Sequence, residues 1–84
     1  MFSCSRFVYV LQSAGYPEKY CVGLTSNALQ RLEVHNSGGS QHTRQYRPWR
    51  LVVSLEFATE VSAAAFEKYL KTGSGRAFAK RHVV

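Results

Sequence analysis

The amino-acid sequence predicts a small α+β fold, in which a three-stranded antiparallel sheet packs with helices. The chain has 84 residues, of which 45% are hydrophobic, so we expect one domain covering residues 1–84. Three apolar segments rich in β-branched and aromatic residues have the composition of strands, and two later segments are typical of helices. The predicted order, β-β-α-β-α-α, indicates a small antiparallel sheet with helices against it.

The first two strands are predicted to form a hairpin. Residues 7–11 read FVYVL and residues 20–24 read YCVGL, and both segments have strand composition. The segment QSAGYPEK between them contains Gly15 and Pro17, which favour turns. Two such strands joined by this longer loop indicate a β-hairpin.

The first helix is expected directly after this hairpin, through the segment NALQRLEVHN. Thr25 and Ser26 are each suitable as its N-cap, because their hydroxyls can accept a hydrogen bond from a free backbone N–H. Leu29 and Leu32 are expected to face the core, and the glycines of SGG end the helix.

A long basic loop precedes the third strand. Residues 37–49, SGGSQHTRQYRPW, form a polar segment that is long for so small a domain, and long loops in compact domains are often functional. The third strand is RLVVSLEF, residues 50–57. Tyr46 and Trp49 offer planar surfaces that could stack on bases, although burial of the Trp49 indole in the core is the favoured interpretation.

The second helix is predicted over EVSAAAFEKYLK, with Thr59 as its N-cap. Ala63, Phe66 and Leu70 recur at helical spacing and are expected to face inward. The final segment, RAFAKRHVV, is predicted to form one more short helix.

The charge of the chain indicates a polyanionic partner. Eleven Lys and Arg residues stand against five Glu and no Asp, giving a formal net charge of +6, which favours nucleic acid over a membrane. So few carboxylates argue against a two-metal site. Cys4 and Cys21 are too few for a disulfide framework. No apolar segment approaches the roughly 20 residues that span a bilayer, and no signal peptide is evident, so we expect a cytoplasmic protein.

Several polar residues are candidates for chemistry, although each has an ordinary structural explanation. Arg31 and His35 are four residues apart and share one face of the first helix, which is also typical of a solvated surface. Tyr9 lies in the middle of a strand, where a core tyrosine is common. Glu67 lies in an alanine-rich helix, where it can form an i,i+4 ion pair with Lys71.

Taken together, the segments FVYVL, YCVGLTSNALQRLEVHN, RPWRLVVSLEF and AAAFEKYLKTGSG resemble the GIY-YIG endonuclease family, especially its small stand-alone bacterial members. The resemblance covers roughly residues 6–81. Its most specific part is the corner formed by Gly23 and Thr25, followed by Arg31 and then His35 at fixed spacings.

The resemblance implies a metal-dependent endonuclease that hydrolyses DNA phosphodiester bonds, of a structure-specific or repair-related kind. It assigns Tyr9 to activating or orienting the attacking water, and Arg31 to stabilising the charge that develops on the phosphate. His35 would assist proton transfer or hold the phosphate. Glu67 would coordinate one Mg²⁺ or Mn²⁺ ion.

The sequence departs from the family pattern at one motif position. The second motif triplet, tyrosine-x-glycine, aligns with Cys21-Val22-Gly23, so a cysteine replaces the tyrosine. Tyr20 is adjacent, but side chains alternate along a strand, so Tyr20 is expected on the opposite face. Inert packing is the favoured role of Cys21, with a weakened phosphate contact or partial replacement as alternatives. A catalytically weakened nucleic-acid-binding module, or a nuclease subunit that takes its substrate specificity from a partner protein, therefore stays open as an alternative.

Contacts to DNA are expected from basic residues around this site, because cations position a protein on the phosphate backbone. Lys80 and Arg81, with the other basic residues of the C-terminal part, would extend this surface or only solubilise the second helix. The predicted phosphate-binding residues are Arg44, Arg47, Arg50, Lys68, Lys71 and Arg76.

Overall fold

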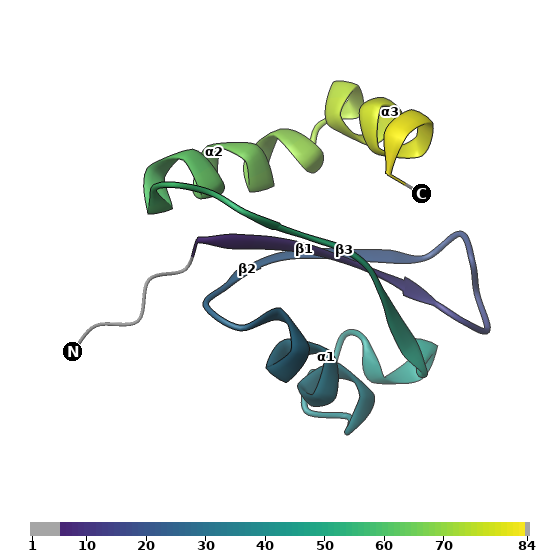
Figure 1. The fold of residues 1–84 in the computed structure, drawn as a ribbon. Helices are drawn as coiled ribbons and strands as arrows, with labels where there is room; N and C mark the ends of the chain where they lie inside the picture. The colour runs from purple at the N-terminus through teal and green to yellow at the C-terminus, as the bar shows by residue number, and fades with distance from the viewer. Residues whose placement is uncertain (1–5, 84) are drawn as a thin grey trace.

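The computed structural model describes residues 6–83 and contains one three-stranded sheet with helices on both of its faces (Figure 1). The sheet order is β2-β1-β3 and both pairings are antiparallel, so β1 is the central strand. This architecture confirms the predicted α+β fold and element order. The elements are β1 (Phe7–Ser13), β2 (Tyr20–Thr25), α1 (Ala28–Asn36), the 3₁₀ helix η1 (Arg44–Tyr46), β3 (Trp49–Glu56), α2 (Glu60–Leu70) and α3 (Gly73–His82).

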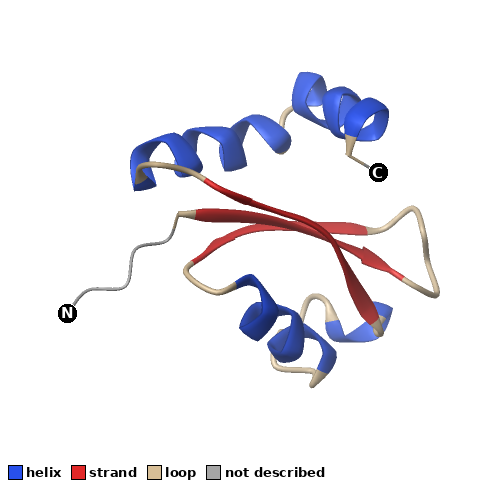
Figure 2. Ribbon diagram, viewed as in Figure 1, coloured by secondary structure: helices blue, strands red, loops and turns tan. Residues whose placement is uncertain are grey.

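The two faces of the sheet carry separate apolar cores. Alternate side chains of β1 point to opposite sides, as strand geometry requires. Helix α1 and the η1 loop cover one face, and α2 and α3 cover the other (Figure 2). The core on the α2 side is built on Val8, Val10, Ala63 and Leu70. The core on the α1 side is built on Tyr9, Leu11, Ala28 and Trp49.

The N-cap of α1 is Asn27, so the prediction of Thr25 or Ser26 was wrong. The Asn27 side-chain oxygen accepts a hydrogen bond from the backbone N–H of Gln30, at 3.1 Å. The Thr25 hydroxyl oxygen instead accepts from the backbone N–H of Asn27, at 3.0 Å. Thr25 therefore fixes the residue that caps the helix and does not cap it directly.

The buried stripe of α1 also differs from the predicted one. Leu29 is 66% exposed, which contradicts its expected place in the core. The residues that face the sheet are Ala28, Leu32 and His35, and these positions recur at the spacing of one helix face. Because this stripe begins at Ala28, the adjacent Leu29 is turned toward solvent.

Hydrogen bonds to Trp49 fix the loop between α1 and β3. Its side chain is buried, as favoured from the sequence, so the indole is not available for stacking on bases. The indole N–H donates to the Thr43 carbonyl oxygen at 2.9 Å, and the Asn36 amide donates to the Trp49 carbonyl oxygen at 2.9 Å. These bonds hold the loop against the end of α1.

Helices α2 and α3 pack as a pair on the other face. Thr59 caps α2 as predicted, accepting from the backbone N–H of Ser62 at 3.1 Å. Ala63 and Leu70 are buried, and Phe66 packs partly buried against the same core, so the predicted inward face is confirmed. None of the helices within residues 6–83 is long and apolar enough to cross a membrane. Cys4 lies outside the described residues.

Candidate active site

The first feature of the site is the ring of Tyr9, which lies over Gly23 of the neighbouring strand β2. Tyr9 of β1 pairs with Gly23 of β2. A Cβ atom at Gly23 would overlap the hydroxyl oxygen and the ring of Tyr9, so only glycine leaves room for the ring at this position. The glycine of the motif therefore lets Tyr9, which is 3% exposed, extend its hydroxyl across β2.

His35, in the last turn of α1, meets this hydroxyl. The Nε2 atom of His35 lies 3.3 Å from the Tyr9 hydroxyl oxygen, and its Nδ1 atom lies 2.8 Å from the Thr43 hydroxyl oxygen. His35 is 4% exposed, so the interpretation of this helix face as a solvated surface is wrong at this residue. Burial lowers the pKa of His35 below its usual 6.5, and the Arg31 charge lowers it further. The imidazole is therefore neutral at pH 7, with one donor and one acceptor nitrogen.

Arg31 lies one turn before His35 and acts on the same hydroxyl. Burial raises the pKa of Tyr9, while Arg31 lowers it through hydrogen bonding and through its charge. The effect of burial is the larger one, so the hydroxyl keeps its proton at neutral pH. Arg31 thus places a permanent positive charge beside a neutral phenol.

Glu67 and Lys71 reach this region from α2. The Glu67 carboxylate and the Lys71 ammonium form the i,i+4 ion pair considered from the sequence, at 2.6 Å, with side chains that are 16% and 55% exposed. The Lys71 charge lowers the pKa of both Tyr9 and Cys21, although burial raises both overall. The ion pair comes from the helix on the other face of the sheet, and the Lys71 charge acts on Tyr9 and Cys21 electrostatically.

This arrangement fits a hydrated divalent cation better than an enclosed metal site. Within residues 6–83, no three His, Cys, Asp or Glu side chains gather closely enough to form a metal site. Mg²⁺ commonly takes one or two carboxylates, keeps several waters and binds substrate phosphates. Glu67 supplies the one carboxylate that such a site needs, in a partly exposed position.

Cys21 lies on the same face of β2 as Gly23 and contacts the site. Its sulfur is 3.9 Å from Nε2 of His35, and the side chain packs partly buried in the core on the α1 side. Burial raises the pKa of the thiol, so it is protonated and is only a weak donor. Tyr20 lines a groove with Val10 and Val22 on the other face, which confirms the predicted alternation.

Comparison with known proteins agrees with this geometry. The sequence profile of the GIY-YIG catalytic domain matches residues 5–81. The chain belongs to the GIY-YIG family. The family predicted from the sequence is confirmed, because the profile of its catalytic domain matches nearly the whole chain.

Proteins similar to this GIY-YIG domain include SLX1 endonuclease subunits and UPF0213 proteins. A structure-specific endonuclease subunit SLX1 homolog of Giardia intestinalis is 38% identical over 71 residues, covering 80% of this chain and 19% of the relative. UPF0213 proteins of Streptococcus pneumoniae and Lactococcus lactis are 35% and 37% identical, covering 77% and 80% of this chain and 65% and 67% of the relatives. The chain thus spans about a fifth of the SLX1 homolog. No solved structure matches it.

The six predicted phosphate-binding residues do not form one surface. Lys71 and Arg76 line the same groove on the α2 and α3 side. Arg50 donates to the side-chain oxygen of Gln12, which follows Val10 on that face of β1. These three cations therefore lie on the face of the sheet that α2 and α3 cover.

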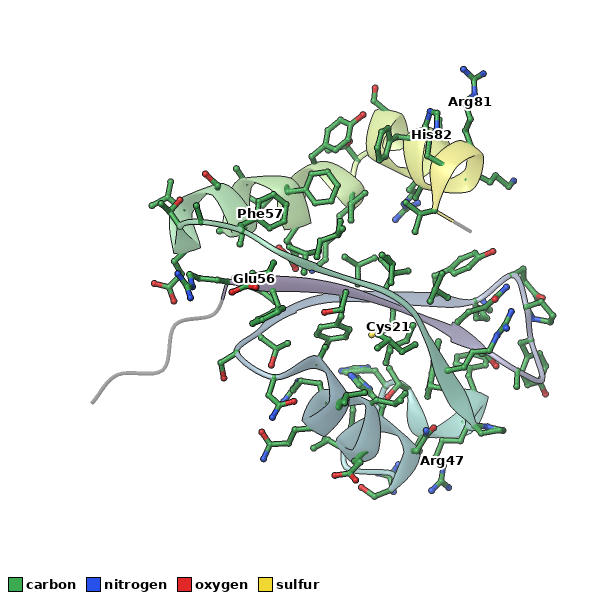
Figure 3. The ribbon with its side chains drawn as sticks, in the orientation of Figure 1. Cys21, Arg47, Glu56, Phe57, Arg81 and His82 are labelled. Atoms are coloured by element: carbon green, nitrogen blue, oxygen red, sulfur yellow. The ribbon has the colours of Figure 1, made fainter. Side chains whose placement is uncertain are left out.

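The remaining three predicted phosphate contacts lie elsewhere. Arg44 and Arg47 are exposed in the loop after α1, where the Arg47 side chain donates to the Arg44 carbonyl oxygen at 2.8 Å. Figure 3 shows Arg47 at the surface on the α1 side, pointing away from the sheet. Lys68 is exposed on α2. A duplex that contacted Arg47 and Arg76 together would have to pass around the edge of the sheet.

Thr43 is a site residue that sequence reasoning missed. Its hydroxyl contacts His35, and its carbonyl accepts from the buried Trp49 indole, so its position is set by the core. The unusual length of its loop was the only signal that pointed to this segment. If Nδ1–H of His35 donates to Thr43, Nε2 is left as the acceptor that faces Tyr9.

We expect Thr43→Val to lower kcat for DNA cleavage by about tenfold, less than the full contribution of an acid–base residue. Valine keeps the shape of threonine but has no hydroxyl to accept the hydrogen bond from Nδ1–H that selects the His35 tautomer. Thr43→Ser, which keeps the hydroxyl, should retain most of the activity. The measurement is single-turnover cleavage of a labelled duplex, with KM expected to change little. Equal rates for the Val and Ser variants would contradict the role of this hydroxyl.

Proposed function

We propose that this GIY-YIG domain cleaves DNA phosphodiester bonds by water attack, with one divalent cation at Glu67. The observation that carries the proposal is the contact between the Tyr9 hydroxyl and a buried, neutral His35. A buried tyrosine–histidine pair beside Arg31 provides a path for a proton and a cation for the phosphate in one place.

In this mechanism Tyr9 acts as a neutral phenol. Its O–H donates to Nε2 of His35, so its oxygen lone pairs remain able to accept a hydrogen bond from water. As that water attacks the phosphorus, its proton passes to Tyr9 and the Tyr9 proton passes to His35, while the bond from phosphorus to the leaving oxygen breaks and that oxygen takes a proton from solvent. Thr43 holds Nδ1–H of His35 throughout the transfer, and Arg31 stabilises the negative charge on the phosphate oxygens.

Glu67 would hold the Mg²⁺ or Mn²⁺ ion, which would supply further stabilisation of the negative charge on the phosphate and the leaving oxygen. Lys71 contacts one oxygen of the Glu67 carboxylate, and opening of this ion pair would leave both oxygens available to the cation. Lys71 is 55% exposed, so its ammonium can turn toward solvent or toward a phosphate without unfolding of α2. The ion pair thus holds the carboxylate in place before the cation and the substrate arrive.

The substrate class is inferred from the relatives. Those named SLX1 are described as subunits of a structure-specific endonuclease, so we propose branched or nicked DNA as the substrate. Because those relatives are named as subunits, we also propose a partner protein that supplies substrate specificity. The cytoplasmic location expected from the sequence stays a prediction.

The test is nicking of supercoiled plasmid and of a labelled branched duplex by the purified protein. We expect cleavage in Mg²⁺ or Mn²⁺ and none in excess chelator, with activity restored when the metal is added back. Unchanged cleavage in chelator would contradict the metal-dependent mechanism. The alternative of a weakened binding module predicts instead that the wild type binds DNA without cutting, and that Cys21→Tyr cuts.

A further inference from the structure

A groove lies on the face of the sheet opposite Tyr9, and the mechanism above assigns no ligand to it. It has a volume of about 640 Å³ and lies between β2, the end of α2 and helix α3. Such a volume falls within the range of small-ligand sites. The side chains of its floor are apolar, and they are Val10, Val22, Leu70 and Ala79.

The rim of this groove is mainly cationic. Lys71, Arg76 and Lys80 line it, against one carboxylate, Glu18. Lys19 lines it too, although its ammonium lies 5.3 Å from the centroid of the Tyr46 ring. An apolar floor below a positive rim is complementary to a ligand with a flat apolar body and an anionic backbone.

Tyr20 presents an aromatic side chain at the hairpin end of the groove. It is 42% exposed, and its hydroxyl accepts a hydrogen bond from the Gln12 amide at 3.4 Å. The same amide donates to the Pro17 carbonyl oxygen at 2.9 Å, and the Gln12 oxygen accepts from Arg50. The tyrosine is therefore held at its hydroxyl by a polar network, while much of its surface is exposed to solvent.

Lys71 connects this groove to the candidate active site. It lines the groove, pairs with Glu67 and acts electrostatically on Tyr9 and Cys21. A strand that occupied the groove would therefore pass close to the carboxylate proposed to hold the cation. Opening of the ion pair would also release the Lys71 ammonium toward a phosphate of that strand.

We infer that the groove binds an unpaired stretch of the DNA substrate, with a base against Tyr20 and phosphates against Arg76 and Lys80. Proteins that bind single strands combine aromatic side chains with a positive groove, as found here. A duplex keeps its bases stacked inside the helix, so it would leave the apolar floor of the groove without a partner. This inference rests on the proposed function and deepens it, because it assigns recognition of the unpaired arm to α3 and the β1–β2 hairpin.

The test measures binding in excess chelator, so that no cleavage is required. The probes are a fluorescently labelled single strand of about 12 nucleotides, a blunt duplex of the same length and an oligoglutamate peptide. Tyr20→Ala should weaken binding of the single strand by about tenfold and leave duplex binding unchanged. Tyr20→Phe, which keeps the ring, should bind the single strand nearly as the wild type does.

Charge is tested by a matched pair of substitutions on α3. Arg76→Ala should lower the slope of log affinity against log salt for the single strand by about 0.7, the value for one phosphate contact. Arg81→Ala should leave this slope unchanged, because Arg81 does not line the groove and points away from the sheet (Figure 3). Equal effects of the two substitutions would overturn the assignment.

Shape is tested by Ala79→Phe, which fills the groove and keeps every charge. It should weaken single-strand binding as Tyr20→Ala does, and circular dichroism would verify that both variants are folded. Wild-type affinity in both variants, or equally tight binding of oligoglutamate, would overturn the inference. Plasmid nicking measures the proposed function separately, so loss of cleavage with normal single-strand binding would count against the mechanism and leave the groove assignment standing.

Discussion

Glu67→Gln is expected to lower the rate of DNA cleavage by about 10³-fold at saturating Mg²⁺, because loss of cation binding removes several kcal/mol of charge stabilisation. Glutamine keeps the shape of glutamate but is a neutral and weaker ligand. The substitution also leaves the Lys71 ammonium without its partner at 2.6 Å. The measurement is the single-turnover nicking rate across a series of Mg²⁺ concentrations.

The fold should not change in this variant. The Glu67–Lys71 pair has one half-exposed partner, and surface ion pairs contribute about 0–1 kcal/mol to stability. Glu33→Gln, which removes an exposed carboxylate from α1, is the matched control and should cleave as the wild type does. A Glu67→Gln protein that keeps more than about a tenth of the wild-type rate would exclude Glu67 as the essential metal ligand.

Tyr9→Phe is the second substitution with a large expected effect. It removes one hydroxyl and preserves the ring across Gly23, so cleavage should fall by about 10²- to 10⁴-fold, the usual range for an acid–base group. It also takes a hydrogen-bond partner from buried His35, so the free energy of unfolding should fall by about 1 kcal/mol. Thermal denaturation and single-turnover cleavage together would measure both effects.

The pH dependence of DNA cleavage by the wild type tests the proton transfer between Tyr9 and His35. Because burial and Arg31 lower the pKa of His35, cleavage should persist below pH 6.5 and fall as the pH drops through that lowered value. Protonation of His35 removes the acceptor for the Tyr9 proton, so residual cleavage by Tyr9→Phe should lack this acid limb. Tyr16→Phe, in the exposed hairpin loop, should keep the wild-type profile. An acid limb centred above pH 6.5 would argue against His35 as the acceptor.

The strands and the cap of α2 were predictable because their signals are local. Short apolar segments rich in β-branched and aromatic residues, and the turn residues of the hairpin, identify strands without knowledge of the partner strand. Thr59 stands alone before its helix, whereas Thr25, Ser26 and Asn27 are three consecutive capping residues. Which of these three caps α1 depends on how β2 ends, and that is set by tertiary packing. The exposure of Leu29 follows from the same one-position uncertainty.

The part of the site that could be predicted from local sequence is the pair of residues that lies within one helix, α1. The spacing of Arg31 and His35 fixes their separation within α1, so their proximity follows from the sequence alone. Thr43 comes from the following loop, and Lys71 comes from a helix on the opposite face of the sheet. The contact of Thr43 depends on the path of the loop around Trp49, and the electrostatic effect of Lys71 depends on the position of α2, and no local pattern encodes either of them.

The contact between Tyr9 and Gly23 has a consequence for which substitutions the motif tolerates. Side-chain volume at position 23 is already taken by the ring from the neighbouring strand, so even a methyl group there competes with Tyr9 for the same space. Position 21 differs, because Cys21 is half-buried and accommodates a small side chain without displacing that ring. Residue 23 can therefore gain volume only if residue 9 loses it, whereas a small side chain at position 21 does not occupy the space of the Tyr9 ring.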